Sequence, residues 1–424
     1  MKKFLRFSLI SVLIVTSAFA VFKISSKYRV SILKDDIDCT IITKGCDRGK
    51  SIAVDEDGST YIAYSDSIKL ISSDGKETTL YRDKNLNIEE LIYLDKGLFI
   101  VSNNSLLKFS LEDEEIETII ENIPLGGNDI DRKLLVKDDE LYLSIGARTN
   151  AGISDGQEKD LYPIDVTLNG VNYGNNRTGA FKASGYPSSE NEKIKGETIG
   201  NAAVYKVNYR DKSLKLFASG IRGITGFDYD SDGNILAIFS GMKNEGLRPV
   251  NRDSDYIYKL NENYWYGWPD YSGGDPISSP KFKGEESVKS LIKNPPNKIV
   301  ATPFYQSNSL DSLREMAIDR EGGVFPSDSI ILWDRETQTI CSLNKDGVFY
   351  KVLKLREDSN IEDIIYNGEE FLVLDSGIGC IYSIHEKGGL LGFNLPPIVW
   401  AFIFLLTFVL LVIVVLKFTN SKNK

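Results

Sequence analysis

The chain has 424 residues, which is enough for one large domain or two domains of ordinary size. Its formal net charge of −10 excludes the broad basic face with which proteins bind nucleic-acid phosphates. Hydrophobic residues make up 42% of the chain and charged residues 26%, the balance of a globular protein. The 21 tyrosines and 20 phenylalanines favour β-strands.

The N-terminal segment is apolar and has a basic start. Lys2, Lys3 and Arg6 precede the apolar run 7–22, and the sequence Ala-Phe-Ala at 18–20 suits cleavage by signal peptidase. Residues 1–23 are therefore predicted to be either a cleaved signal peptide or a retained signal anchor.

A second apolar run, residues 395–416, holds 22 residues without a charge, which is long enough to span a bilayer. It is predicted to be a transmembrane helix, and buried core helices are the alternative for both runs. Because Lys417, Lys422 and Lys424 follow it, the positive-inside rule places the tail 417–424 in the cytoplasm. The protein is thus expected in the cell membrane, with the body between the two runs on the extracytoplasmic side.

A strand–turn–strand unit recurs six times along this body. The units lie at 51–75, 88–109, 128–207, 220–260, 316–343 and 361–384, with a base period of about 40 residues. Each unit is a small sheet that cannot bury its own faces, and stacking six of them around an axis covers those faces. The sequence therefore predicts an all-β fold, a six-bladed β-propeller over residues 50–390, after a lead-in segment at 24–49. A pair of β-sandwiches is the alternative.

Two insertions interrupt the rhythm. The first, at about 150–200, is rich in Gly, Asn and Ser, and the second, at about 265–304, is rich in Pro and Gly. Loops of this length in a compact domain are usually binding loops or lids. We expect both insertions on one mouth of the propeller axis, because loops from equivalent strand ends emerge on one face.

The most specific motifs lie in the fourth unit and beside the two insertions. The fourth unit contains GIR at 220–222, FDYDSDGN at 227–234 and GLRPV at 246–250, and WYGWPDYSGGDP follows at 265–276. SIGARTNAG at 144–152, DVTLNG at 165–170 and RTGAF at 177–181 support them. Over residues 125–305 these motifs resemble the glucose/sorbosone dehydrogenase family, in particular its membrane-associated bacterial branch.

This resemblance implies a six-bladed propeller that oxidises a sugar with pyrroloquinoline quinone (PQQ) and calcium. It also implies a histidine base that takes the hydroxyl proton as hydride leaves. The only histidine in this chain is His385, in the sixth unit and outside the motif region. Gly223 and the loop 240–242 also depart from the family pattern, which has Asn at the first position and an acidic residue or Asn at the second.

Four arginines lie in the loops of this region. A guanidinium fork binds carboxylates bidentately, and it would suit a quinone with three carboxylates or an acidic sugar. Inter-blade salt bridges and plain solvation are the alternatives. The predicted cofactor- or substrate-binding residues in these loops are Arg148, Thr149, Asn150, Arg177, Arg222, Arg248, Asn251 and Asp255.

Two further sets of residues each allow a binding role and a structural one. Trp265 and Trp268 are either a stacking platform for a sugar or cofactor ring or packing between blades. Asp228, Asp230 and Asp232 have the spacing of a calcium loop that uses oxygen ligands. A plain hairpin turn is the alternative for these aspartates, because an apolar strand follows at 235–239.

The four cysteines, Cys39, Cys46, Cys341 and Cys380, allow two disulfides in an extracytoplasmic protein, and the sequence does not assign their pairing. Free or buried thiols are the alternative.

Two functions therefore stand side by side. The first is a membrane-anchored sugar dehydrogenase of the PQQ-dependent type. The second is a catalytically inactive propeller that binds glycans or a partner protein. The resemblance favours the first, and the missing histidine favours the second.

Overall fold

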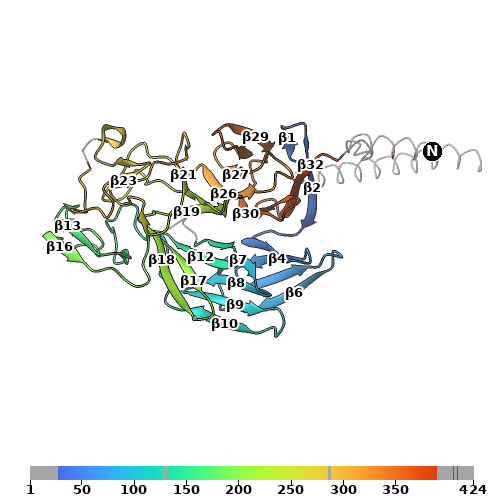
Figure 1. Ribbon diagram of the computed structural model, residues 1–424, viewed down its shortest axis with the longest axis horizontal. Coiled ribbons are helices and arrows are strands. Elements are labelled where there is room, and N and C mark those ends of the chain that lie inside the picture. Colours follow the sequence, from blue (N-terminus) through green and yellow to red (C-terminus); the bar gives the residue numbers. More distant parts are fainter. Residues whose placement is uncertain (1–26, 128–131, 285–287, 389–403, 405–407, 409–424) are drawn as a thin grey trace, which may run out of the picture. The chain divides into compact units, whose positions relative to one another are not determined.

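The computed structural model describes residues 27–127, 132–284 and 288–388, together with Phe404 and Phe408. The unit 30–386 forms six antiparallel sheets around one axis, which confirms the predicted six-bladed β-propeller (Figure 1). Within the described residues, no helix is long and apolar enough to cross a membrane. The predicted signal segment 1–23, the tail 417–424 and nearly all of the predicted transmembrane helix 395–416 lie outside the described residues.

Each blade has four strands, which are named in order from the innermost strand outward. Blade 1 contains β3 (Ser51–Val54), β4 (Thr60–Tyr64), β5 (Ser67–Ile71) and β6 (Glu77–Arg82). Blade 2 contains β7 (Ile88–Leu94), β8 (Gly97–Ser102), β9 (Ser105–Ser110) and β10 (Ile116–Ile120). Blade 3 contains β11 (Leu134–Lys137), β12 (Glu140–Ile145), β17 (Ala203–Asn208) and β18 (Ser213–Ser219).

The second half of the ring repeats this pattern. Blade 4 contains β19 (Ile224–Tyr229), β20 (Ile235–Phe239), β21 (Tyr256–Lys259) and β25 (Tyr305–Gln306). Blade 5 contains β26 (Leu313–Asp319), β27 (Ser329–Asp334), β28 (Thr339–Leu343) and β29 (Phe349–Lys354), and β1 (Ser31–Ile32) extends its outer edge. Blade 6 contains β30 (Ile361–Tyr366), β31 (Phe371–Asp375), β32 (Cys380–Glu386) and β2 (Ile37–Lys44).

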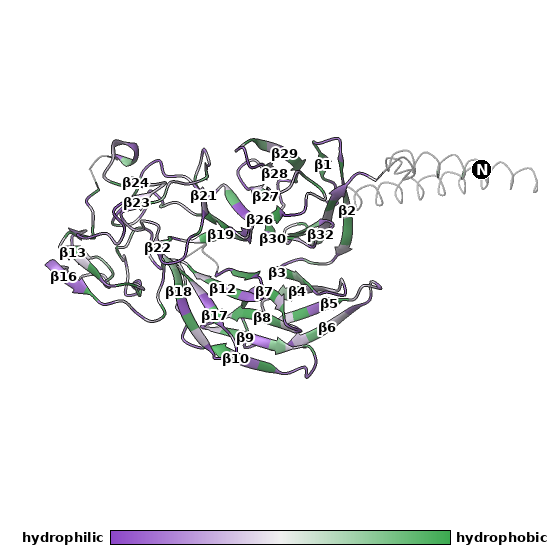
Figure 2. Cartoon of the chain, in the orientation of Figure 1, coloured by the Kyte–Doolittle hydropathy of each residue, from purple (hydrophilic) through white to green (hydrophobic). Residues whose placement is uncertain are grey.

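Turn residues and apolar runs in the sequence explain where the blade hairpins form and why their strands are buried. In the first hairpin, Asp55 accepts hydrogen bonds from the backbone N–H groups of Asp57 and Ser59, and Gly58 takes a positive φ of 79°. All six residues of β8 are buried, because neighbouring blades cover both faces of its sheet. Figure 2 shows hydrophobic residues concentrated in the blade strands.

The blades form a closed ring. The innermost strands contact one another in the order β3, β7, β11, β19, β26 and β30, and β30 contacts β3 again. The ring is also closed by β2, which pairs antiparallel with β32 from Ile37↔Glu386 to Lys44↔Cys380. The segment 24–49, expected to lie outside the propeller, therefore supplies an outer strand to blades 5 and 6. The repeat pattern did not reveal this segment, because β1 and β2 do not pair with a strand that is adjacent to them in the sequence.

The insertions span 146–202, between β12 and β17, and 260–304, between β21 and β25. The first contains two hairpins, β13 (Val166–Asn169) with β16 (Glu190–Ile194) and β14 (Asn172–Tyr173) with β15 (Thr178–Gly179). The second contains β22 (Tyr264–Trp265), the hairpin of β23 (Tyr271–Ser272) and β24 (Asp275–Pro276), and a single 3-10 turn (Pro280–Phe282).

The expectation that both insertions leave equivalent strand ends is wrong. The first leaves the second strand of blade 3, whereas the second leaves the third strand of blade 4, which runs the opposite way. The second insertion nevertheless reaches blade 3, because its strand β22 runs parallel to β18 and pairs Tyr264 with Ala218 and Trp265 with Ser219. This pairing brings the two insertions together.

Candidate functional site

A cavity of about 730 Å³ lies where the first insertion meets the loops of blade 4, and we call it the lateral cavity. It gathers five of the predicted site residues from three separate stretches of the chain. These residues are Arg148, Thr149, Asn150, Arg222 and Arg248. Three acidic side chains, Asp155, Glu158 and Glu245, also line it.

The start of the first insertion is positioned by a buried carboxylate that the sequence analysis did not single out. Asp160 accepts hydrogen bonds from the backbone N–H of Arg148 at 2.5 Å and from the Thr149 hydroxyl at 2.6 Å. Burial raises the pKa of Asp160 to about 6. No motif marked Asp160, which lies in a polar insertion twelve residues after the arginine it holds.

Asn150 ties the two insertions to blade 4. Its side-chain amide donates to the Lys243 carbonyl at 2.7 Å, and its side-chain oxygen accepts from the Lys243 N–H at 2.7 Å. Its backbone carbonyl accepts from the Trp268 indole at 3.1 Å. Asn150 therefore builds the wall of the lateral cavity.

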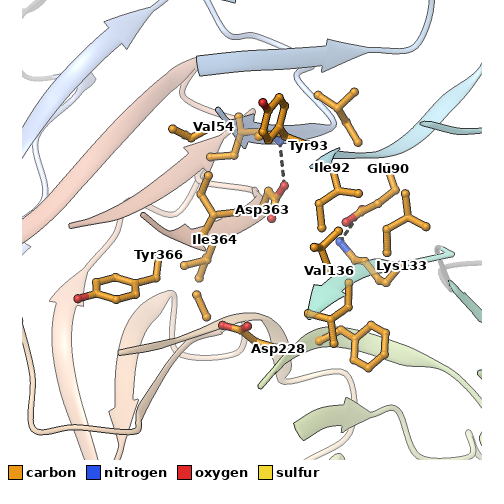
Figure 3. A pocket seen from close by; sticks show the side chains of 18 of the residues that line it. Val54, Glu90, Ile92, Tyr93, Lys133, Val136, Asp228, Asp363, Ile364 and Tyr366 are labelled. Carbon is orange, nitrogen blue, oxygen red and sulfur yellow. Dashed lines mark hydrogen bonds and ion pairs between the residues drawn. The ribbon is translucent and has the colours of Figure 1, made fainter. Parts of the chain in front are cut away.

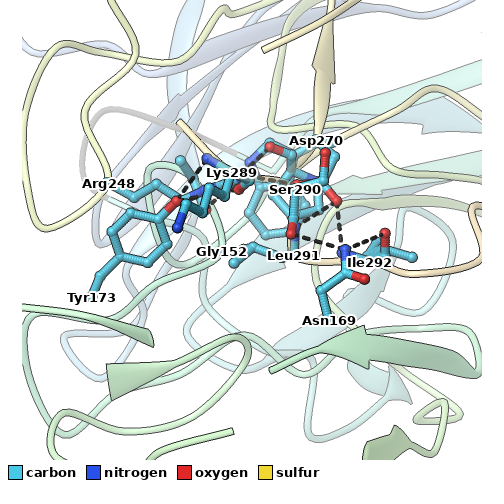
Figure 4. A network of polar contacts seen from close by, with 12 residues as sticks. Gly152, Asn169, Tyr173, Arg248, Asp270, Lys289, Ser290, Leu291 and Ile292 are labelled. Carbon is cyan, nitrogen blue, oxygen red and sulfur yellow. Dashed lines mark hydrogen bonds and ion pairs between the residues drawn. The ribbon is translucent and has the colours of Figure 1, made fainter. Parts of the chain in front are cut away.

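Arg248 is a buried structural clamp, contrary to its predicted role as a ligand-binding fork. Its Nη1 donates to the carbonyls of Ala151 at 2.9 Å and Pro269 at 2.8 Å, and its Nη2 donates to the Lys289 carbonyl at 2.8 Å and to Asp270 Oδ1 at 2.6 Å (Figure 4). Only 2% of Arg248 is exposed. The guanidinium thus joins the two insertions to each other through these hydrogen bonds.

The two tryptophans follow the packing alternative. Trp265 is 1% exposed and donates its indole N–H to the Tyr162 hydroxyl at 2.7 Å. Tyr162 in turn stacks on Phe181, with ring centroids 4.4 Å apart, beside the buried Trp268. The aromatic residues therefore form the core that the two insertions share, with no ring face open to the lateral cavity.

Arg222 differs from the other arginines. Its backbone carbonyl accepts from the Ala147 N–H at 2.7 Å, which places it beside the start of the first insertion. Only 7% of Arg222 is exposed, and burial lowers the pKa of its guanidinium. Its Nη1 donates to the Ser240 hydroxyl at 2.8 Å, its Nε has no partner, and it forms no ion pair with any described residue. Arg222 is thus a desolvated cation that forms no ion pair with a described residue, although the negative charges of Asp311, Asp253, Glu245 and Asp255 act on it and partly oppose the effect of burial on its pKa.

A second cavity of about 20 Å³ lies against Arg222, lined also by Ser240, Tyr256 and Trp268. This is enough space for one water molecule, which would satisfy a buried N–H. Arg222 therefore lies between a water-sized cavity and the larger lateral cavity.

The remaining predicted ligand-binding residues lie elsewhere. Arg177 is exposed on the β14–β15 turn, and Asn251 does not line the lateral cavity. Asp255 is buried and accepts hydrogen bonds from the N–H groups of Ser312 at 2.7 Å and Leu313 at 3.0 Å, so it joins blade 4 to blade 5.

The predicted calcium loop is a hairpin turn. Asp228 points to Arg320, with 2.8 Å between Oδ1 and Nη1, and also accepts from the Ile318 N–H. Asp230 caps the turn through Asn234, whereas Asp232 is exposed. In the described part of the chain, no three His, Cys, Asp or Glu side chains are grouped to hold a metal ion.

His385 lies on β32 beside Ser383, with 3.1 Å between Nδ1 and the hydroxyl oxygen, and it does not line the lateral cavity. The four cysteines are free thiols, so the alternative without disulfides holds in this structure. Burial raises the pKa of three of them, Cys39, Cys46 and Cys341.

Two further cavities lie near the propeller axis. The channel cavity, about 270 Å³, is lined by the innermost strands. Lys133 lies there 3.2 Å from Glu90 (Figure 3) and also forms an ion pair with Glu315 at 2.7 Å. Burial raises the pKa of Glu90 well above its ordinary value. The axial cavity, about 360 Å³, lies at the axis and is lined by residues that include Lys50, Glu89, Gly127, Lys133, Arg148 and Glu362.

No protein-family model and no curated protein matches this chain. Solved structures do match it. The Trichoderma reesei carbohydrate-active enzyme of family AA12, in a calcium structure, has 13% identity and a TM-score of 0.58 over 85% of this chain and 98% of that chain. The PQQ domain of Coprinopsis cinerea pyranose dehydrogenase has 10% identity and a TM-score of 0.57 over 85% and 97%. PQQ-bound aldose sugar dehydrogenase from Streptomyces coelicolor has 12% identity and a TM-score of 0.54 over 85% and 98%.

This chain has the fold of the PQQ-dependent sugar dehydrogenases. The six blades and the ring closure of the described unit agree with that likeness. At this level of identity the comparison establishes the fold alone.

The described residues do not fit the quinone and calcium that the resemblance implies. Arg248 is already bonded to protein acceptors, and the indole rings of Trp265 and Trp268 are buried in the insertion core. The calcium-loop aspartates do not converge, and the only histidine lies on an outer strand pair of blade 6. What the site does offer is Arg222, a buried cation that forms no ion pair with the described residues.

Proposed function

We propose that this protein is a propeller that binds an anionic sugar in the lateral cavity on the extracytoplasmic side of a cell membrane. The observation that carries the proposal is Arg222, a buried guanidinium that lines the cavity and has no carboxylate partner among the described residues. A buried cation of this kind gains most from an anionic ligand, because the surrounding protein screens their attraction poorly.

The rest of the lining suits a sugar. Asp155, Glu158 and Glu245 supply carboxylate acceptors for sugar hydroxyl groups. A sugar carboxylate would take the bidentate position on the Arg222 guanidinium. The volume lies within the range of cavities that hold small organic ligands.

Membrane anchoring is part of this proposal. It is supported by the two apolar runs in the sequence and by the way the propeller unit begins and ends. The unit begins at Val30 with β1, on the outer edge of blade 5, and it ends at Glu386, which pairs with Ile37 of β2 in blade 6. The segments that lead to the two predicted membrane runs therefore start from neighbouring blades.

A second candidate function is sugar oxidation with PQQ and calcium, as in the sugar dehydrogenases whose fold this chain shares. It is favoured by the fold likeness over 85% of the chain. The quinone would supply the hydride acceptor. The described residues of the site supply neither the expected base nor a stacking platform, so we place this function second.

Calorimetric titration of the full-length chain in detergent with glucuronate and with glucose tests the first proposal. We expect binding of glucuronate and much weaker binding of glucose. Equal binding of both sugars, or binding of neither, would contradict it, and the second result would favour a protein partner. Reduction of an electron-accepting dye in the presence of sugar, PQQ and calcium would favour the second function.

A further inference from the structure

We infer that the lateral cavity is one end of an elongated groove that binds an anionic oligosaccharide, with one end of the chain at Arg222 and the other at the propeller axis. This inference rests on the proposed function, because it extends the same site. It concerns the length of the ligand and the second set of residues that would hold it.

Two of the cavities share part of their lining. Gly127 and Arg148 line both the lateral cavity, of about 730 Å³, and the axial cavity, of about 360 Å³. The two spaces therefore adjoin at these residues. Together they extend from Arg222 beside the insertions to Lys50 on the innermost part of blade 1.

The junction between the cavities has a backbone floor. The Gly127 N–H donates to the Ala147 carbonyl at 2.7 Å, and a Cβ at Gly127 would lie 3.0 Å from the carbonyl oxygens of both Ala147 and Arg148. The close approach leaves no comfortable room for a side chain at this position. Glycine at position 127 thus allows the close approach of the Ala147 and Arg148 backbone beside the junction.

Arg148 is the side chain at the junction, and its contacts are of two kinds. Its backbone is fixed by the buried Asp160, whereas its guanidinium is held by the Gly126 carbonyl at 2.7 Å and by an ion pair with Glu158. The Glu158 side chain is 66% exposed. Because exposed ion pairs are weak, a ligand carboxylate competes readily with Glu158 for the same guanidinium.

Acidic side chains line both ends of the groove, Asp155, Glu158 and Glu245 at the lateral end and Glu89 and Glu362 at the axial end. Cations are distributed along it as well. Arg222 lines the lateral end, Arg148 lines the junction and Lys50 lines the axial end, where it pairs with Glu362 at 3.5 Å. No aromatic residue is among the described residues that line either cavity. Neutral sugars usually need an aromatic face to stack on, so charge is the recognition that this groove provides. A chain of hexuronic acid units carries one carboxylate per unit and matches that pattern.

Calorimetry with galacturonic acid and its di- and trisaccharides tests the inference on the full-length chain in detergent. We expect the trisaccharide to bind about tenfold more tightly than the monosaccharide, because it adds charged contacts at both Arg148 and Lys50. Lys50→Gln should weaken trisaccharide binding about two- to fivefold, as for an exposed ion pair, and leave monosaccharide binding unchanged. Arg210→Gln is the matched control, since Arg210 lies on the β17–β18 hairpin and lines neither cavity.

The outcomes separate the two proposals. Equal affinity for the mono- and trisaccharide, or trisaccharide affinity that Lys50→Gln leaves unchanged, overturns the groove and leaves the proposed function standing. Equal affinity for a neutral trisaccharide overturns the anionic ligand class. Absence of binding by every acidic sugar overturns the proposed function itself.

Discussion

Asp363 joins the last blade to the first. One of its carboxylate oxygens accepts hydrogen bonds from the Ser51 hydroxyl and from the Ile52 N–H, both at 2.8 Å. Ser51 and Asp363 are 312 residues apart in the sequence and lie on neighbouring innermost strands, β3 and β30. The ring is therefore closed at its centre by a side chain as well as at its rim by the β2–β32 pairing.

Replacing Asp363 by alanine should lower the free energy of unfolding by about 2–3 kcal/mol, because two buried donors lose their acceptor. Urea denaturation followed by tryptophan fluorescence measures this loss. Asp57→Ala, in the exposed β3–β4 turn, is the control and should change stability little. Equal effects of the two substitutions would show that the Asp363 contact does not stabilise ring closure.

The Arg248–Asp270 pair should be coupled. Arg248→Met alone should lower the free energy of unfolding by about 3–5 kcal/mol, because it leaves the buried Asp270 without its cation. Adding Asp270→Leu should recover part of that loss. A double-mutant cycle built from urea midpoints measures the coupling. Purely additive effects would mean that the two side chains act separately.

Gly220 should tolerate alanine worse than another glycine of the same backbone conformation. Gly220 and Gly45 both have positive φ, 70° and 81°, so alanine costs each about 1–2 kcal/mol. A Cβ at Gly220 would lie 2.4 Å from the Trp265 ring, whereas nothing lies within 4 Å at Gly45. Overpacking should therefore add about 1–3 kcal/mol at Gly220. Equal thermal midpoints for Gly220→Ala and Gly45→Ala would show that Trp265 gives way freely.

Asp255 should make stability depend on pH. Burial raises its pKa from the usual value of 3.8 to about 6, so the folded protein holds this proton more tightly than the unfolded chain. Stability should therefore fall as pH rises from about 4 to 6, by about 3 kcal/mol relative to Asp255→Asn. Urea midpoints of both proteins across this range measure the difference. Parallel pH profiles would mean that Asp255 is ionised in the folded state as readily as in the unfolded one.

The fold was predictable because the repeats are local. Each blade hairpin is encoded by a short stretch of sequence, such as the turn Asp55–Gly58 followed by an apolar strand. Six such stretches specify the ring. The outer strand β2 was not predictable in this way, since its partner β32 begins more than 300 residues later. The detour of the second insertion along β18 depends on the parallel pairing at Trp265, which no local pattern encodes.

The sequence could group some of the site residues, but it could not assign their roles. The polar motif residues Arg148, Asn150, Arg222 and Arg248 do meet in one cavity. Sequence does not tell which arginine already has a partner, because the acceptors of Arg248 come from four distant backbone and side-chain groups. Asp160 was not predictable for the same reason, because its carboxylate accepts hydrogen bonds from Arg148 and Thr149 only after the chain has folded back onto them.

The central claim is that Arg222 serves a ligand and does not stabilise the fold. Burying the Arg222 guanidinium costs free energy that no ion pair with a described residue offsets, so Arg222→Met should leave the free energy of unfolding unchanged or raise it.

Measuring glucuronate affinity and urea stability together on wild-type protein and Arg222→Met tests this claim most directly. We predict that the affinity falls at least about tenfold, the loss of a charged hydrogen bond, while stability is kept. Unchanged affinity together with lower stability would contradict the account and make Arg222 a structural residue.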